Sequence, residues 1–166
     1  MTTSLAPTSA DGRSASSRAA RLAVDKLAPH MSKAMNALDA ASRKTELEPA
    51  LLELVRARAS QLNGCAYCVD LHSRDARAIG ETEQRLALVA VWREAGQFTA
   101  RECAALAFTE AVTLMARDHV PDEAWAAVAE HFTEDELGAL VALITTINAW
   151  NAVGVSTRAW PVEAAA

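Results

Sequence analysis

Apolar residues recur at intervals of three and four residues along most of the chain. The last long apolar segment shows the pattern well, with Leu137, Leu140, Val141, Ile144, Ile147 and Trp150. This spacing puts the side chains on one side of an α-helix. No stretch of four to eight residues alternates apolar and polar positions between turn signals, as a half-buried strand would. The pattern therefore predicts an all-α protein.

Capping and turn residues mark where the helices begin and end. Three Thr/Glu pairs have the spacing of a capping box, which starts a helix: Thr45 with Glu48, Thr99 with Glu102, and Thr133 with Glu136. Asn63-Gly64 is a strong signal for a helix end followed by a tight turn. Together these signals predict about seven helices, among them helices over about 14–27, 65–79, 82–96 and 100–117.

The 166 residues suit one domain. Residues 1–15 are rich in Ser, Thr and Ala and lack the apolar core of a secretory signal, so we expect a flexible tail before a helical domain over 16–166. The chain has no run of about 18 uncharged apolar residues, so no membrane-spanning helix is expected. The expected location is the reducing cytoplasm.

Charge and apolar content add two expectations. The net charge of −5 gives no basic surface for a nucleic acid, and we therefore expect no nucleic-acid partner. The segments 84–92 and 137–150 are apolar over more than one helix stripe, and such helices need burial on several sides. A domain of this size has a limited interior, so part of that surface is expected to pack against other subunits.

The segment with the clearest chemistry surrounds Cys65 and Cys68, which follow the Asn63-Gly64 break. Both cysteines fall in the first turn of the next helix, where free N–H groups and the helix dipole favour a thiolate. His72 is four residues after Cys68 and shares its helix face. Glu53 lies on the preceding helix, which the short turn folds back antiparallel. We therefore predict a Glu53–His72–Cys68 proton relay, with Cys65 as the resolving thiol.

Two other interpretations of these cysteines stay open at this stage. The pair can be two small buried residues of a helical core. Alternatively, Cys65, Cys68 and His72 have plausible zinc-ligand spacing. The fourth ligand would then be Cys103, His119 or His131. A thioredoxin-like fold is disfavoured, because there the C-x-x-C follows a strand.

The pattern Glu-x11-Cys-x2-Cys-x3-His, within ELVRARASQLNGCAYCVDLH, resembles the active-site motif of alkylhydroperoxidase AhpD-like proteins of the carboxymuconolactone decarboxylase superfamily. The following segment, GETEQRLALVAVWREAGQFTARECAALAFTEAVT, is also similar to the core of that family. The resemblance runs from about Pro29 to Trp160. It implies an all-α fold that assembles as a homotrimer or homohexamer.

The resemblance also implies roles for individual residues. Cys68 matches the cysteine that attacks the peroxide, and Cys65 matches the resolving cysteine. Glu53 and His72 match the acid–base pair that deprotonates the attacking thiol through a water. Tyr67 stands where the best-known members have a second histidine, and its phenol cannot act as the base near neutral pH.

The function expected from this resemblance is a thiol-dependent peroxidase of the alkyl hydroperoxide reductase type, without metal, flavin or haem. Its partners would be a peroxide substrate and an external dithiol reductant. The alternatives are a general thiol-disulfide oxidoreductase, a decarboxylase or lactone-acting enzyme on the same scaffold, and a non-enzymatic oligomeric or zinc-binding module. The decarboxylase branch lacks the cysteine pair, so the pair favours the redox branch.

Overall fold

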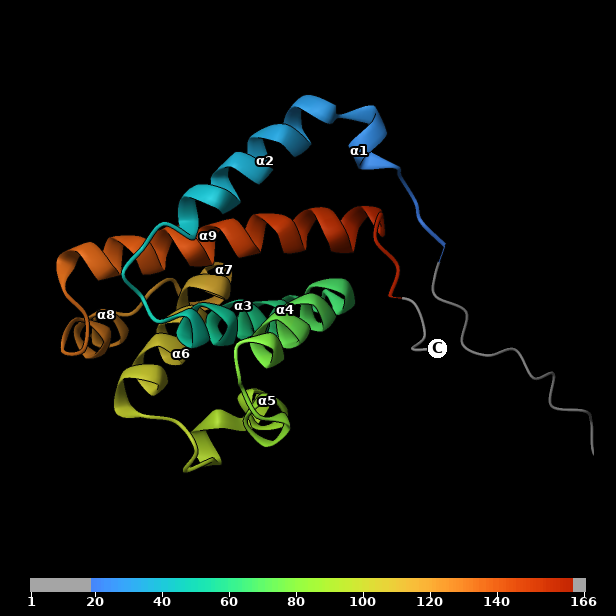
Figure 1. Ribbon diagram of the computed structural model, residues 1–166. Helices are drawn as coiled ribbons and strands as arrows, with labels where there is room; N and C mark the ends of the chain where they lie inside the picture. Colours follow the sequence, from blue (N-terminus) through green and yellow to red (C-terminus); the bar gives the residue numbers. More distant parts are fainter. Residues whose placement is uncertain (1–18, 163–166) are drawn as a thin grey trace, which may run out of the picture.

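A computed structural model describes residues 19–162 of the chain (Figure 1). That part of the chain is helical and contains no strand, which confirms the all-α prediction. Its helices are α1 (Val24–Leu27), α2 (Pro29–Ser42), α3 (Pro49–Asn63), α4 (Ala66–Ala78), α5 (Glu83–Leu88), the 3₁₀ helix η1 (Val89–Glu94), α6 (Ala100–Thr113), α7 (Met115–Asp118), α8 (Asp122–Ala129) and α9 (Glu134–Thr157).

Helix α3 is the centre of the fold. It packs against α4, α6 and α9, so its side chains are covered on nearly all sides. Every residue from Leu51 to Ala57 is buried, including the charged Glu53 and Arg56. The main core lies between α3, α6, α8 and α9, and its largest buried members include Val55, Phe108, Leu140 and Ile144. The charged pair in α3 therefore lies inside the domain rather than on a solvated helix face.

Helix α9 is the longest helix and runs across the domain between α2 on one side and α3 and α4 on the other (Figure 1). Among the described residues it is the one helix long and apolar enough to meet the simple test for a membrane span. It packs on α3, α2, α6 and α4, and core helices of globular domains pass the same test. Val141 and Val155 nevertheless remain exposed on it.

A polar cluster fixes α3 against α9 close to the cysteine turn. The Asn63 side-chain amide donates to Asn148 Oδ1 at 2.6 Å and to Asn151 Oδ1 at 3.0 Å. Asn151 in turn donates to Ser60 Oγ at 3.0 Å. Buried and partly buried amides that satisfy one another in this way specify one alignment of the two helices.

Several predicted boundaries are confirmed. Thr99 and Thr133 form complete capping boxes with Glu102 and Glu136. Gly64 ends α3 in the left-handed conformation, with φ of 68°. The predicted start at Thr45 is wrong, because Pro49 occupies the first turn of α3 and its fixed φ sets the start there.

Other boundaries also differ from the prediction. The expected helix over 82–96 is divided into α5 and η1, with non-helical dihedrals at Val91. The expected helix over 100–117 ends at Thr113, and α7 follows separately. Of the expected first helix over 14–27, only Val24–Leu27 is helical among the described residues, and 14–18 lie outside them. The predicted tail over 1–15 also lies outside the described residues.

Candidate active site

The two cysteines form a disulfide at the start of α4, with their Cα atoms 5.3 Å apart. Cys65 is the N-cap of this helix, and its sulfur accepts a hydrogen bond from the backbone N–H of Cys68 at 3.4 Å. Both side chains are buried, with 3% of each residue exposed. The structure therefore confirms the prediction that the cysteines follow the Gly64 turn and lie at the start of the next helix. At this place the helix dipole and the N–H of Cys68 favour negative charge on the Cys65 sulfur.

Glu53 and His72 meet between α3 and α4. Nδ1 of His72 lies 2.8 Å from Oε2 of Glu53, and both side chains are buried. Burial opposes the charged form of Glu53, yet the hydrogen bond to His72 and the charge of Arg56 hold the pKa of that carboxyl below its ordinary value. The carboxylate is therefore an acceptor, and Nδ1 of His72 is the donor. The second ring nitrogen, Nε2, is left as the group that can accept a proton.

Arg56 holds the other oxygen of the same carboxylate. Its Nη1 donates to Glu53 Oε1 at 2.7 Å, and only 1% of Arg56 is exposed. Arg43, the C-cap residue of α2, lies 3.7 Å from the same oxygen and also pairs with Asp39. Desolvation, the first cause, and the charge of Arg43 lower the pKa of Arg56, while Glu53 raises it. Glu53 thus links α3 to α4 through the hydrogen bond with His72, and an ionic contact with Arg43 connects it to the end of α2.

A cavity of about 410 Å³ opens beside Cys68 and His72. Its apolar and aromatic wall consists of Leu71, Tyr67, Trp150 and Trp160. Its polar side is formed by Asp25, Asn36, Asp39 and Arg43. An organic molecule with a small polar head fits this combination of surfaces.

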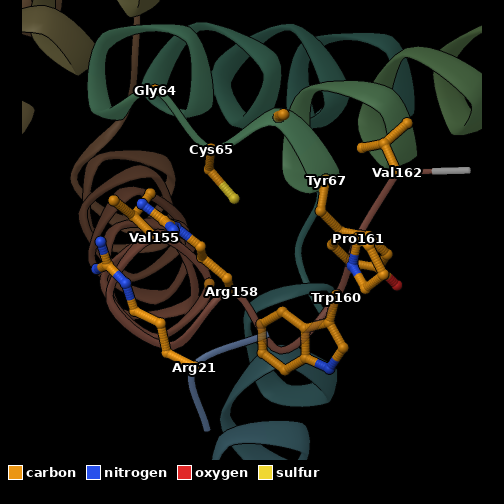
Figure 2. Close-up of a pocket in the computed structure, with 11 residues that line it drawn as sticks. Arg21, Gly64, Cys65, Tyr67, Val155, Arg158, Trp160, Pro161 and Val162 are labelled. Carbon is orange, nitrogen blue, oxygen red and sulfur yellow. The ribbon is translucent and has the colours of Figure 1, made fainter. Parts of the chain in front are cut away.

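A second cavity, of about 440 Å³, lies on the Cys65 side of the disulfide. Figure 2 shows the Cys65 side chain pointing into it, between Tyr67 and Trp160 on one side and Val155 on the other. The rings of Tyr67 and Trp160 have centroids 5.6 Å apart and border both cavities. Tyr67 therefore belongs to the site as part of a wall between two spaces.

The candidate metal ligands differ from the predicted zinc set. Among the described residues, the group that could hold a metal ion is Glu53, His72 and Asp75, whose ligand atoms lie within 4.8 Å of one another. Neither the cysteines nor His119 and His131 belong to that group. The guanidinium on Glu53 competes directly with a cation there, since it neutralises the carboxylate.

The structure brings together all five predicted site residues, namely Cys65, Cys68, Glu53, His72 and Tyr67. Cys103 remains a free thiol about 35 residues away in the chain and packs in a separate apolar cluster. The sequence alone did not reveal the positions of Arg43 and Trp160 at the site, whereas an ion pair between Arg56 and Glu53 could be expected. The only signal for Arg56 was its i, i+3 spacing from Glu53, whereas nothing local placed Trp160 beside Tyr67.

Comparison with known proteins gives the family. The model of the carboxymuconolactone decarboxylase family matches residues 29–111. The chain belongs to this family. The matched range contains α2, α3 and α4 and so includes Glu53, both paired cysteines and His72.

Relatives of this family member include proteins with little assigned function. YdfG of Bacillus subtilis, an uncharacterized protein, is 37% identical over 136 residues, which cover 82% of this chain and 92% of YdfG. A structure of a protein of unknown function from Agrobacterium tumefaciens, provisionally assigned to AhpD-type antioxidant defence, is also 37% identical. It has a TM-score of 0.84 and covers 87% of this chain and 100% of its own.

A more distant structure shows that the fold occurs with other chemistry. The debrominase Bmp8 is 20% identical, with a TM-score of 0.73 over 82% of this chain and 73% of its own. This likeness concerns the fold alone. The chain is therefore an AhpD-like member of the carboxymuconolactone decarboxylase family, and its reaction has to be argued from its own residues.

Proposed function

We propose that the protein is a dithiol peroxidase that reduces organic hydroperoxides and hydrogen peroxide with Cys68 and Cys65. The observation that carries the proposal is the combination of a disulfide-forming pair at a helix N-terminus with a buried Glu53–His72 pair on the Cys68 side. Thiol nucleophiles need a lowered pKa and a nearby base, and this arrangement supplies both.

In the first step, Nε2 of His72 takes the proton of the Cys68 thiol, directly or through a water. Glu53 stays ionised and stabilises the imidazolium through Nδ1–H. The Cys68 thiolate attacks the distal peroxide oxygen, the O–O bond breaks, and Cys68 becomes a sulfenic acid. The alkoxide that leaves takes the proton from His72 and departs as an alcohol, or as water when the substrate is hydrogen peroxide.

In the second step, Cys65 attacks the sulfur of the sulfenic acid, and the disulfide forms as water is released. The N-cap hydrogen bond from the Cys68 N–H favours the thiolate form of Cys65 and so favours this attack. An external dithiol then returns two electrons to the pair by thiol-disulfide exchange.

The cavity beside Cys68 supports organic hydroperoxides as substrates. Its wall of Tyr67, Trp150, Trp160 and Leu71 offers apolar contact to a hydrocarbon group. The peroxide end would then lie toward Cys68 and His72. Hydrogen peroxide would enter the same space but gain none of that contact.

Three alternative activities are separable from this proposal. A general thiol-disulfide oxidoreductase would use the same pair without peroxide. A decarboxylase or lactone-acting enzyme would use Glu53 and His72 and would not need Cys68. A zinc-binding module would keep both thiols blocked by metal.

The deciding experiment oxidises the reduced protein with hydrogen peroxide or cumene hydroperoxide and locates the change by mass spectrometry. The expected result is the loss of two hydrogen atoms, confined to a Cys65–Cys68 disulfide. Cys103→Ser is the matched control and should behave as the wild type, whereas Cys68→Ser should not turn over peroxide. A pair that stays reduced, or oxidation of Cys103 alone, would contradict the proposal.

We also propose that the protein works as a soluble homotrimer or homohexamer in the cytoplasm. The exposed apolar side chains support this, since several of them lie on helices and stay exposed in a single chain: Met31, Leu38, Val141 and Val155. Light scattering that gives the mass of a monomer at micromolar concentration would contradict the assembly.

A further inference from the structure

The disulfide lies between two cavities, each of which borders one of its two cysteines. Cys68 borders the cavity that also contains His72, and Cys65 borders the cavity drawn in Figure 2. The rings of Tyr67 and Trp160 border both and so form the wall between them. A molecule in one cavity therefore meets one cysteine of the pair.

Gly154 of α9 borders the Cys65 cavity and lies directly over the sulfur. A Cβ at this position would stand 3.2 Å from Cys65 Sγ and 3.5 Å from the ring of Trp160. The distance to sulfur is shorter than an ordinary van der Waals contact, so a methyl group there would fill the space above the sulfur. Helix interiors disfavour glycine relative to alanine, so keeping this space open has a cost in stability.

We propose that the two halves of the catalytic cycle use separate entrances: peroxide reaches Cys68 through the His72 cavity, and the reductant reaches Cys65 through the gap that Gly154 leaves open. This inference rests on the proposed peroxidase function and assigns an access role to a residue outside the relay. Gly154 takes no part in the reaction itself; its lack of a side chain keeps the path to the Cys65 sulfur open.

The chemistry of reduction suits attack on Cys65. A thiolate of the external dithiol bonds to Cys65 Sγ, the Cys65–Cys68 bond breaks, and Cys68 leaves as a thiolate. The second thiol of the reductant then attacks its own sulfur in the mixed disulfide and releases Cys65. Two electrons pass to the protein, and the reductant leaves as a disulfide. The first attack thus regenerates Cys68 in its reactive form, beside His72.

Charge around the Cys65 cavity also favours an incoming thiolate. Arg21 and Arg158 both line it, and Figure 2 shows their side chains along the α9 side of the space. Arg21 also donates to the backbone carbonyl of Ser156 at 3.3 Å, which holds it near the end of α9. Positive charge near the attacking atom raises the local concentration of an anion.

A third cavity reaches Cys65 from another direction. It lies along α3 and α4 and is lined by Ser60, Val69 and Ser73 among others, but not by Gly154. This cavity is an alternative route to Cys65 that the experiment has to distinguish, since a reductant that enters there would not pass Gly154. Ser73→Leu narrows that route and leaves the Gly154 gap unchanged.

The test compares Gly154→Ala with Gly138→Ala, a substitution in the same helix where a Cβ would meet nothing within 4 Å. Each protein is oxidised with diamide, so that reduction can be measured whether or not peroxide is a substrate. Stopped-flow reduction by dithiothreitol should be at least about tenfold slower in Gly154→Ala, given the sensitivity of bimolecular attack to small misplacements. Gly138→Ala and Ser73→Leu should reduce at the wild-type rate.

Two further readouts separate blocked access from a changed disulfide. The equilibrium of the pair with a glutathione buffer should be the same in Gly154→Ala as in the wild type. In the reduced protein, alkylation of Cys65 should slow while the single-turnover reaction of Cys68 with cumene hydroperoxide keeps its rate. Thermal unfolding verifies that the variant is folded.

The inference would be overturned by a wild-type reduction rate in Gly154→Ala, by slow reduction in Ser73→Leu instead, or by a loss confined to the peroxide step. Failure of the peroxidase function itself gives a different result, in which wild-type Cys68 does not react with hydroperoxide. In that case the reduction rate of the diamide-oxidised protein still tests whether the reductant reaches Cys65 past Gly154.

Discussion

His72 and Glu53 form a buried contact of 2.8 Å between the two helices that flank the cysteine turn. The carboxylate uses one oxygen for the imidazole and the other for Arg56. The same group therefore orients the candidate base and neutralises a buried cation. Changes to either partner should affect both chemistry and stability.

Glu53→Gln tests this double role. Gln can still accept the Nδ1–H bond, but it carries no charge to stabilise an imidazolium or to pair with Arg56. Breaking one partner of a buried ion pair costs about 3–5 kcal/mol. We expect that loss in urea unfolding, together with slower alkylation of Cys68 at pH 7. Glu94→Gln, at an exposed position, is the control and should change neither quantity.

Combining Glu53→Gln with Arg56→Met should cost less than the sum of the two single changes. The double variant leaves no unpaired charge in the interior, and such replacements are often close to neutral. The double-mutant cycle in urea therefore gives a coupling energy between the two side chains. Additive losses would show that the pair contributes nothing as a pair.

The acid limit of stability should depend on Arg56. The pKa of Glu53 is below its ordinary value in the folded protein, so its ionic contacts stabilise the fold above pH about 4.5. That contribution is lost as the pH falls through the folded pKa. Without the Arg56 charge the pKa of Glu53 rises, and Arg56→Met should begin to lose stability at a higher pH. Thermal unfolding of both proteins between pH 3 and 7 measures this, because the pH at which Tm falls halfway should be higher in Arg56→Met than in the wild type.

Glu136 offers a second pH-dependent prediction, away from the site. The Arg101 side chain and the N–H of Thr133 lower its pKa from 4.5 to about 2. Its contribution is therefore present above pH about 4.5 and disappears toward pH 2. The Tm of the wild type should therefore exceed that of Glu136→Gln at pH 7, and this difference should shrink toward zero as the pH falls from about 4.5 to about 2. A difference that stays constant with pH would contradict the assignment.

Trp160→Ala should join the two cavities by removing one side of their common wall. The relative rate for cumene hydroperoxide over hydrogen peroxide is then expected to fall, since the apolar contact is lost. The Trp160 indole also donates to Asp25 at 3.0 Å. Trp160→Phe keeps a ring without that donor and should retain most of the substrate preference. Steady-state kcat/KM for both peroxides decides between the two outcomes.

Tyr67→Phe is expected to change peroxide turnover by less than about threefold, since it keeps the ring that packs against Trp160 and borders both cavities. Tyr67→His places an imidazole at the same point and should increase the rate of Cys68 alkylation at pH 7. A large loss in Tyr67→Phe would assign the hydroxyl a direct hydrogen bond to the reacting groups.

The parts of the fold and site that sequence analysis predicted correctly depend on local rules. Helical spacing predicted the all-α class, and the capping boxes at Thr99 and Thr133 depend on residues three positions apart. The meeting of Glu53 and His72 required one further step, because Gly64 folds α3 and α4 into an antiparallel pair. Each of these inferences spans at most two helices.

The parts that could not be predicted depend on contacts far apart in the chain. Arg56 is buried because α4, α6 and α9 cover α3 on several sides, which no periodicity within α3 reveals. Trp160 reaches the site from beyond α9, 93 residues after Tyr67. The non-helical dihedrals at Val91 and the late start of α3 at Pro49 are local features. At Pro49 the proline geometry overrode the capping pattern at Thr45, and at Val91 the helical spacing did not reveal the break.

The asparagine cluster between α3 and α9 also fixes how α9 is aligned with the turn that carries the two cysteines. Asn151 is held against Asn63 and Ser60, and Gly154 follows it by less than one helical turn. An inserted or deleted residue between them would rotate position 154 by about 100° around the helix axis. Cys65 would then face a side chain instead of a gap. In the proposed cycle, the spacing between Asn151 and Gly154 therefore controls access to the disulfide, just as the spacing between the two cysteines allows it to form.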